Sequence, residues 1–168
     1  MALTGPSSPT SPSSYAALGM AVVIVDGRGT TYRSREFLHS IFGRLNVNGL
    51  DDHVAAIKAI ARRHPWLDLG RVGVIGRSYG GWSTFRAMLE FPESSQVGVA
   101  GPPPGSQHNM YLDYHATAMH GPPRYDDGSE RRPTPTAVPR NWNVIDGRQQ
   151  ADRLRGKLLV IMGELDEN

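Results

Sequence analysis

The segment RVGVIGRSYGG, residues 71–81, decides the fold of this chain. It begins with a short apolar run rich in β-branched residues, 71–76, which is typical of a strand buried in a sheet. Residues 79–90 then follow a helical period, and three bulky side chains share one face of that helix: Trp82, Phe85 and Leu89. The sequence therefore predicts a strand and a helix joined by a tight turn at Arg77 and Ser78.

Further strands and helices alternate on both sides of this segment. Residues 21–25 form an apolar run without polar alternation, which predicts a strand covered on both faces. A helix is predicted from Asn48 onward, because apolar residues recur at helical spacing and Asn48 stands where a capping residue is favoured. Downstream, the sequence predicts a strand at 97–100, a short helix at 149–154 and a strand at 157–162.

This alternation predicts an α/β fold with a mostly parallel sheet and flanking helices. In such folds ligands collect outside the carboxyl ends of the strands, so functional residues are expected in the loops that follow them. A chain of 168 residues is long enough for one domain with its own core.

The composition excludes several classes of site and partner. The chain contains no cysteine, which rules out disulfide scaffolds, thiolate zinc sites and thiol nucleophiles. Its 18 basic and 16 acidic side chains are scattered, so no nucleic-acid partner is expected. No stretch approaches the roughly 20 apolar residues of a membrane span, and the N-terminus lacks the pattern of a secretory signal. No membrane partner is therefore expected, and the default localisation is cytoplasmic.

Two proline-rich segments interrupt the alternating pattern. Residues 1–18 are expected to be a flexible N-terminal stretch, because residues 5–14, GPSSPTSPSS, are too rich in proline and serine to bury much surface or to form a helix. Residues 122–140 mix prolines with charges of both signs and are expected to form a loop. The predicted domain covers residues 19–168.

The turn at residues 76–80, GRSYG, fits the G-x-S-x-G pattern of a nucleophile elbow. A hydrolytic serine needs a strained strand-to-helix turn with small residues on both sides, so that its hydroxyl stands clear of the sheet. Ser78 is therefore the candidate nucleophile, and the backbone N–H of Tyr79 is the candidate oxyanion donor. The alternative interpretation is a glycine-rich connection in which Ser78 only caps the helix.

A serine nucleophile needs a base, and the base needs an orienting carboxylate. Asp166 is the candidate acid, because it follows the predicted strand 157–162 after a turn, as the chain order of such hydrolases requires. The alternative interpretation of Asp166 is a solvated turn carboxylate. None of the six histidines follows Asp166, and surface or packing roles are expected for His108, His115 and His120.

Five motifs stand in this order along the chain: DGRGT at 26–30, FGRL at 42–45, GRSYGG at 76–81, VAG at 99–101 and LLVIMGELDEN at 158–168. Together they resemble the catalytic domain of prolyl oligopeptidase-type serine peptidases. The resemblance is closest to the dipeptidyl peptidase IV and acylaminoacyl-peptidase branch, and it runs from about Gly19 to the last residue.

The resemblance implies a partial α/β-hydrolase fold, a Ser-Asp-His mechanism that needs no metal or organic cofactor, and a peptide as substrate. It also implies a β-propeller domain in the complete protein. By position, it implies that Ser78 is the nucleophile, Tyr79 an oxyanion donor and Asp166 the triad acid. Tyr111 and Asn168 match residues beside the substrate pocket.

The chain departs from the family pattern at both ends. The family's catalytic histidine belongs to a loop beyond Asn168. If Gly5-Pro6 is the remnant of the family's Gly-Gly-Pro-like turn, Leu3 stands where the family has the tyrosine that gives the second oxyanion donor. The expectation is therefore an incomplete peptidase domain that is inactive when isolated. Two alternatives stay open: an esterase or other acyl hydrolase on the same fold, and a non-catalytic truncated relative.

Overall fold

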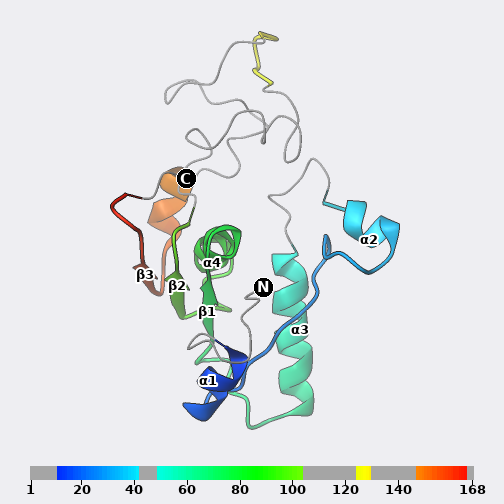
Figure 1. Ribbon diagram of the computed structural model, residues 1–168, viewed down its shortest axis with the longest axis vertical. Helices are drawn as coiled ribbons and strands as arrows, with labels where there is room; N and C mark the ends of the chain where they lie inside the picture. Colours follow the sequence, from blue (N-terminus) through cyan, green and yellow to red (C-terminus); the bar gives the residue numbers. More distant parts are fainter. Residues whose placement is uncertain (1–10, 42–48, 104–123, 130–146, 166–168) are drawn as a thin grey trace.

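The computed structural model describes residues 11–41, 49–103, 124–129 and 147–165 (Figure 1). Along the chain the elements are α1 (Pro12–Ala17), α2 (Arg35–His39), α3 (Leu50–Arg63), β1 (Gly73–Gly76), α4 (Tyr79–Glu90), β2 (Val97–Ala100), the 3-10 helix η4 (Gly147–Arg153) and β3 (Lys157–Val160). Among the residues so described, no helix is both long enough and apolar enough to cross a lipid bilayer.

The three strands form a parallel sheet in the order β1-β2-β3, with β2 in the centre (Figure 1). The register places Gly76, Ala100 and Val160 level with one another at the carboxyl ends of the strands. Helix α4 connects β1 to β2 and packs against both strands. The predicted α/β architecture, with a parallel sheet and flanking helices, is confirmed.

The buried core lies between α4 and the sheet. Met88 is fully buried on α4, and Trp82, Ala87 and Leu89 on the same helix are also buried. A Cβ atom at Gly98 in β2 would lie 2.7 Å from Cγ of Met88, so only glycine at this position lets the helix approach the strand this closely. Of the three bulky side chains predicted to share one face of this helix, Trp82 and Leu89 are buried and Phe85 is half-buried, while the side chain that meets the sheet at Gly98 is that of Met88.

The long predicted helix is α3, which ends at Arg63 as expected, before Pro65. Its N-cap is Gly49, in the left-handed region at φ 72°, and not Asn48, which lies outside the described residues. Asp52 in the first turn is held by Arg28, whose backbone N–H donates at 2.8 Å and whose Nε donates at 2.9 Å to the same carboxylate oxygen. The turn after residues 21–25 is thereby fixed to the start of α3.

The prediction of a strand at 21–25 is wrong for the described sheet. These residues have no ladder partner there, and Val22 and Ile24 are exposed. An apolar run becomes a strand only where a neighbouring strand accepts its hydrogen bonds, and the described sheet ends at β1. Apolar composition alone is therefore not enough to make residues 21–25 a strand of the described sheet.

Smaller differences concern the ends of elements. The expectation that residues 5–14 form no helix is wrong from Pro12 onward, because Pro12 occupies the first turn of α1 and the Ser11 hydroxyl accepts from the N–H of Ser14 at 3.3 Å. The short helix expected at 149–154 is the 3-10 helix η4. Strand β3 ends at Val160, although Ile161 still donates to the Ala100 carbonyl at 2.9 Å.

Candidate active site

Ser78 lies on the turn between β1 and α4, two residues beyond the last strand residue. Its backbone is at φ 56° and ψ −123°, a conformation that L-residues rarely adopt. Such a backbone costs about 1–3 kcal/mol and persists only where the surrounding structure fixes it. The side chain of Ser78 is exposed and makes no capping hydrogen bond to α4. This geometry fits an elbow that presents a hydroxyl. The alternative, in which Ser78 only caps the helix, lacks the capping hydrogen bond that it requires.

The glycines around the turn allow the backbone segments to approach closely. A Cβ atom at Gly76 would collide with the carbonyl of Gly80, and one at Gly81 would collide with the carbonyl of Gly101. The N–H of Gly101 donates to the Gly76 carbonyl at 2.8 Å, which ties the segment after β2 to the base of the elbow. The small residues of the motif are therefore required by backbone contacts.

The N-terminus of α4 stands directly behind Ser78. Tyr79 is the first residue of the helix, so its N–H belongs to the group directed out of the helix end, where the macrodipole is positive. The N–H of Gly80 donates to the Arg77 carbonyl at 2.9 Å and closes the turn. This arrangement can stabilise negative charge that develops next to the Ser78 hydroxyl.

The carboxyl ends of the strands place the remaining candidates relative to Ser78. Gly76 and Val160 are level with one another on strands separated by β2, a separation of about 10 Å from two inter-strand spacings. The chain leaves β1 towards Ser78 and leaves β3 towards Leu165 at this same edge of the sheet. The imidazole ring of a histidine held between these two loops could therefore contact residues of both loops.

Of the predicted site residues, Ser78 and Tyr79 lie in the described part of the chain, next to each other at the start of α4. Asp166, the candidate acid, lies one position beyond the described residues, and Asn168 and Tyr111 also lie outside them. Their roles stay predictions.

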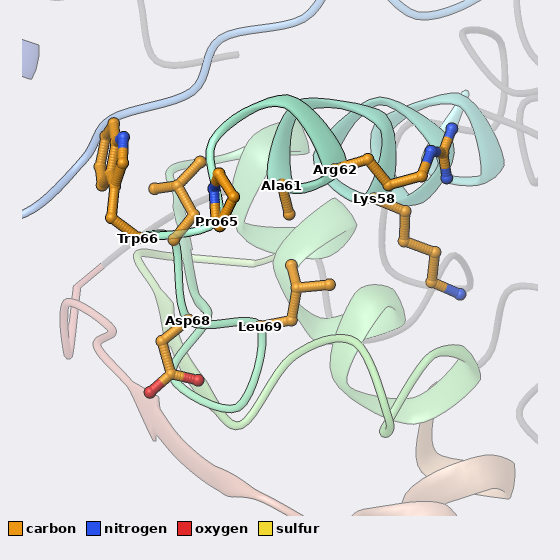
Figure 2. A pocket seen from close by; sticks show the side chains of 8 residues that line it. Lys58, Ala61, Arg62, Pro65, Trp66, Asp68 and Leu69 are labelled. Atoms are coloured by element: carbon orange, nitrogen blue, oxygen red, sulfur yellow. The ribbon is translucent and has the colours of Figure 1, made fainter.

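A shallow hollow of about 470 Å³ lies elsewhere, between the end of α3 and the loop that leads to β1 (Figure 2). In Figure 2 the Leu69 side chain points towards Ala61, Arg62 extends beside the helix away from Trp66, and the Lys58 side chain runs out from the helix. This loop enters β1 at its amino end, whereas Ser78 follows the carboxyl end. The hollow is therefore separate from the candidate active site.

A row of side chains that extends from Tyr79 along α4 was not predicted from the sequence. The sequence predicts Trp82 only as one of three bulky side chains on one helix face, yet its ring lies against both Tyr79 and the guanidinium of Arg86. Arg86 in turn forms an ion pair with Glu90. The signal in the sequence was the repeated spacing of three and four residues between these positions.

Comparison with known families gives one match that covers almost the whole chain. The model of the prolyl oligopeptidase family matches residues 6–168. This range includes β1, the Ser78 elbow, α4, β2 and β3.

Individual relatives agree with this match. Dipeptidyl peptidase 8 from Homo sapiens is 33% identical over 91 residues, which cover 54% of this chain and 10% of that protein. Venom dipeptidyl peptidase 4 from Apis mellifera is 27% identical over 159 residues, which cover 92% of this chain and 19% of that protein.

Solved structures show the same fold. The crystal structure of Porphyromonas gingivalis dipeptidyl peptidase 4 matches with a TM-score of 0.65 and 27% identity, over 82% of this chain and 18% of that one. Pyrococcus horikoshii acylaminoacyl peptidase matches with a TM-score of 0.64 and 20% identity, over 81% of this chain and 21% of that one. The neighbouring structures are α/β-hydrolase peptidases, and the chain spans about a fifth or less of the length of the relatives it matches.

Proposed function

Because the chain belongs to the prolyl oligopeptidase family of serine peptidases, we propose that it supplies the nucleophile and the acid of an active site that hydrolyses peptide bonds. The observation that carries this proposal is the elbow itself: an exposed serine, held in a strained backbone conformation at the end of a parallel strand and the start of a helix. This is the arrangement that a hydrolytic serine needs.

In the proposed reaction the Ser78 oxygen attacks the carbonyl carbon of the scissile peptide, and a histidine takes the hydroxyl proton. The Tyr79 N–H stabilises the oxyanion that forms on the carbonyl oxygen. The tetrahedral intermediate then breaks its C–N bond, and the histidine gives the proton to the departing amine. Water hydrolyses the acyl-enzyme by the same steps and releases Ser78.

The remaining parts of the site are assigned by the order of the family's motifs. Asp166 would hold the histidine in the correct tautomer, and that histidine would lie on a loop beyond Asn168. Tyr111 and Asn168 would contact the substrate. A β-propeller domain would accompany this domain in the complete protein, and residues 1–168 alone would have little activity because they would lack the base.

A fluorophosphonate probe, which reacts with activated serines, tests the proposal. The protein tested would be residues 1–168 joined to the catalytic-domain segments that precede and follow the matched region in a relative. We expect stoichiometric labelling at Ser78 and hydrolysis of a chromogenic peptide, both abolished in Ser78→Ala. Ser94→Ala, which changes a serine in the turn after α4, is the matched control and should behave like the parent.

Asp166→Asn should lower the turnover number by about 10⁴, because the acid orients the base, and should leave the KM nearly unchanged. Normal turnover in Asp166→Asn would contradict the assignment of the acid. Hydrolysis of ester but not peptide chromogens would indicate the esterase alternative, and absence of labelling at Ser78 would indicate a non-catalytic relative.

A further inference from the structure

Four side chains of α4 form a file that starts beside the candidate nucleophile. Tyr79, Trp82, Arg86 and Glu90 are separated by three or four residues, so they lie one after another on one side of the helix. The ring centroids of Tyr79 and Trp82 are 5.1 Å apart. The guanidinium carbon of Arg86 lies 5.0 Å from the centroid of the Trp82 ring. Each member of the file therefore contacts the next.

Tyr79, beside Ser78, is the most exposed member of the file, and the two members in its middle are buried. Tyr79 is 36% exposed, whereas Trp82 is 2% exposed and Arg86 is 9% exposed. Glu90 accepts from Nε of Arg86 at 2.7 Å and also from its Nη2, which fixes the plane of the guanidinium. A cation held against a buried indole in this way is attracted more strongly than one at an exposed site.

Trp82 acts in this file through its ring and not through its N–H group. Within the described part of the chain, its Nε1 is buried and has no hydrogen-bond partner. A buried donor without an acceptor destabilises a protein, so the indole N–H gives no reason for a tryptophan at this position. The contacts that its ring makes with Tyr79 and Arg86 do give one.

The backbone of Trp82 holds the peptide group that joins Ser78 to Tyr79. The N–H of Trp82 donates to the Ser78 carbonyl at 3.0 Å. This peptide is trans, so its N–H points opposite to its carbonyl. The hydrogen bond at the carbonyl therefore directs the Tyr79 N–H out of the helix end, where the reacting carbonyl would lie in the proposed mechanism.

We infer that Trp82 and Arg86 are positioning residues for the oxyanion donor. The Trp82 backbone fixes one side of the Ser78–Tyr79 peptide, and its ring, backed by the Arg86–Glu90 pair, fixes the Tyr79 side chain on the other. Without these contacts the strained backbone at Ser78 could relax by rotation of this same peptide, which would turn the N–H away. The inference rests on the proposed function for its catalytic consequence, but the orientation of the peptide is a structural property that can be measured separately.

Two measurements on Trp82→Leu test the inference. The first is the rate at which a fluorophosphonate labels Ser78 in the extended protein described above. The second is hydrogen exchange, in residues 1–168, of the amide at position 82, which bonds to the Ser78 carbonyl, compared with the Phe91 amide, which bonds to the Ala87 carbonyl at the far end of α4. We expect labelling to slow at least about tenfold, since a complete loss of one oxyanion donor costs 10²–10³. We expect exchange to accelerate about tenfold at position 82 and less than about twofold at Phe91.

Conservative and distant variants separate positioning from general stability. Trp82→Phe keeps an aromatic face and removes the unsatisfied N–H, so it should restore most of the labelling rate and the protection at position 82. Arg86→Met should act in the same direction as Trp82→Leu, with a smaller effect. Arg71→Met is the charge-matched control, because it opens an exposed ion pair with Asp68 at the opposite end of β1.

Equal acceleration of exchange at position 82 and Phe91 in Trp82→Leu would overturn the inference, because it would show only a general loosening of the helix. A labelling rate equal to that of the parent would also overturn it. If the parent itself is not labelled, the proposed function fails, while the exchange measurement still decides whether Trp82 holds the peptide.

Discussion

At the scale of single residues, Ser78 combines two properties that rarely coincide. Its side chain is exposed and makes no capping hydrogen bond to α4, so the side chain does not hold the backbone in place. The backbone is nevertheless in a strained conformation. The conformation at φ 56° and ψ −123° is open to glycine but disfavoured for any residue with a Cβ atom. The strain is therefore a cost that the protein carries in order to place this hydroxyl.

A first prediction follows for the stability of Ser78 variants. Ser78→Gly should raise the free energy of unfolding by about 1 kcal/mol, because the relief of strain exceeds the added entropy of the unfolded chain. Ser78→Ala keeps the Cβ atom and should leave the free energy nearly unchanged. Urea unfolding followed by circular dichroism measures both variants. A glycine variant less stable than the alanine variant would show that the backbone at residue 78 is not strained.

At the scale of elements, the turn at residues 26–30 is docked on the start of α3. The hydrogen bond from Arg28 holds the pKa of the Asp52 carboxyl below its ordinary value. A Cβ atom at Gly27 would lie 3.0 Å from the Gly49 carbonyl and 3.1 Å from Nε2 of His53, so this turn and the helix touch without room for a side chain. His53 is half-buried in this contact, and the burial lowers the pKa of its imidazole.

This contact predicts a dependence of stability on pH. Because the pKa of His53 is lower in the folded chain than its ordinary value of 6.5, the unfolded chain binds the proton more tightly. The contribution of neutral His53 is therefore complete above pH 6.5 and is lost as the pH falls below that value, towards the folded-state pKa. Urea unfolding at a series of pH values should show this loss, and His53→Gln should remove it.

His39 serves as the control for this prediction, since it lies exposed at the end of α2. His39→Gln should keep the pH dependence of the parent. If His53→Gln and the parent lost stability equally over this pH range, another group would be responsible.

At the scale of the whole molecule, apolar side chains are unusually exposed along the strands and their extensions. Val160, Ile161 and Met162 are 43%, 50% and 63% exposed, and Ile24 is 59% exposed. Strands of parallel sheets are normally covered on both faces. The described sheet also ends at β1 and β3, so its outer edges carry backbone groups that can pair with another chain.

We therefore predict that residues 1–168 associate with one another in solution. Sedimentation velocity at micromolar concentrations should show species larger than the monomer. The double variant Ile24→Lys with Met162→Lys should shift the distribution towards the monomer, because it places charges in the exposed apolar regions. Ala55→Lys, which adds a charge on the exposed side of α3, should not. A parent chain that sediments as a monomer would contradict the prediction.

The sequence by itself determined the local elements and the type of chemistry. The spacing of apolar residues predicted α4 with the bounds that the structure gives it, and short β-branched runs predicted β1, β2 and β3. The motif at residues 76–81 predicted the elbow, because glycine and serine in that spacing leave few other backbone conformations for a strand-to-helix turn. These features could be predicted because each depends on residues that are neighbours in the chain.

Only the tertiary structure decided the features that need partners from elsewhere in the chain. It left residues 21–25 without a ladder in the described sheet, it showed that Gly81 must be glycine because the carbonyl of Gly101 lies against it, and it set β1 and β3 level on either side of β2. It also placed the Arg86 guanidinium over the Trp82 ring. Periodicity records which side chains are buried, but ladder pairing, close backbone approach and ring contacts depend on distances between elements, which the order of residues does not contain.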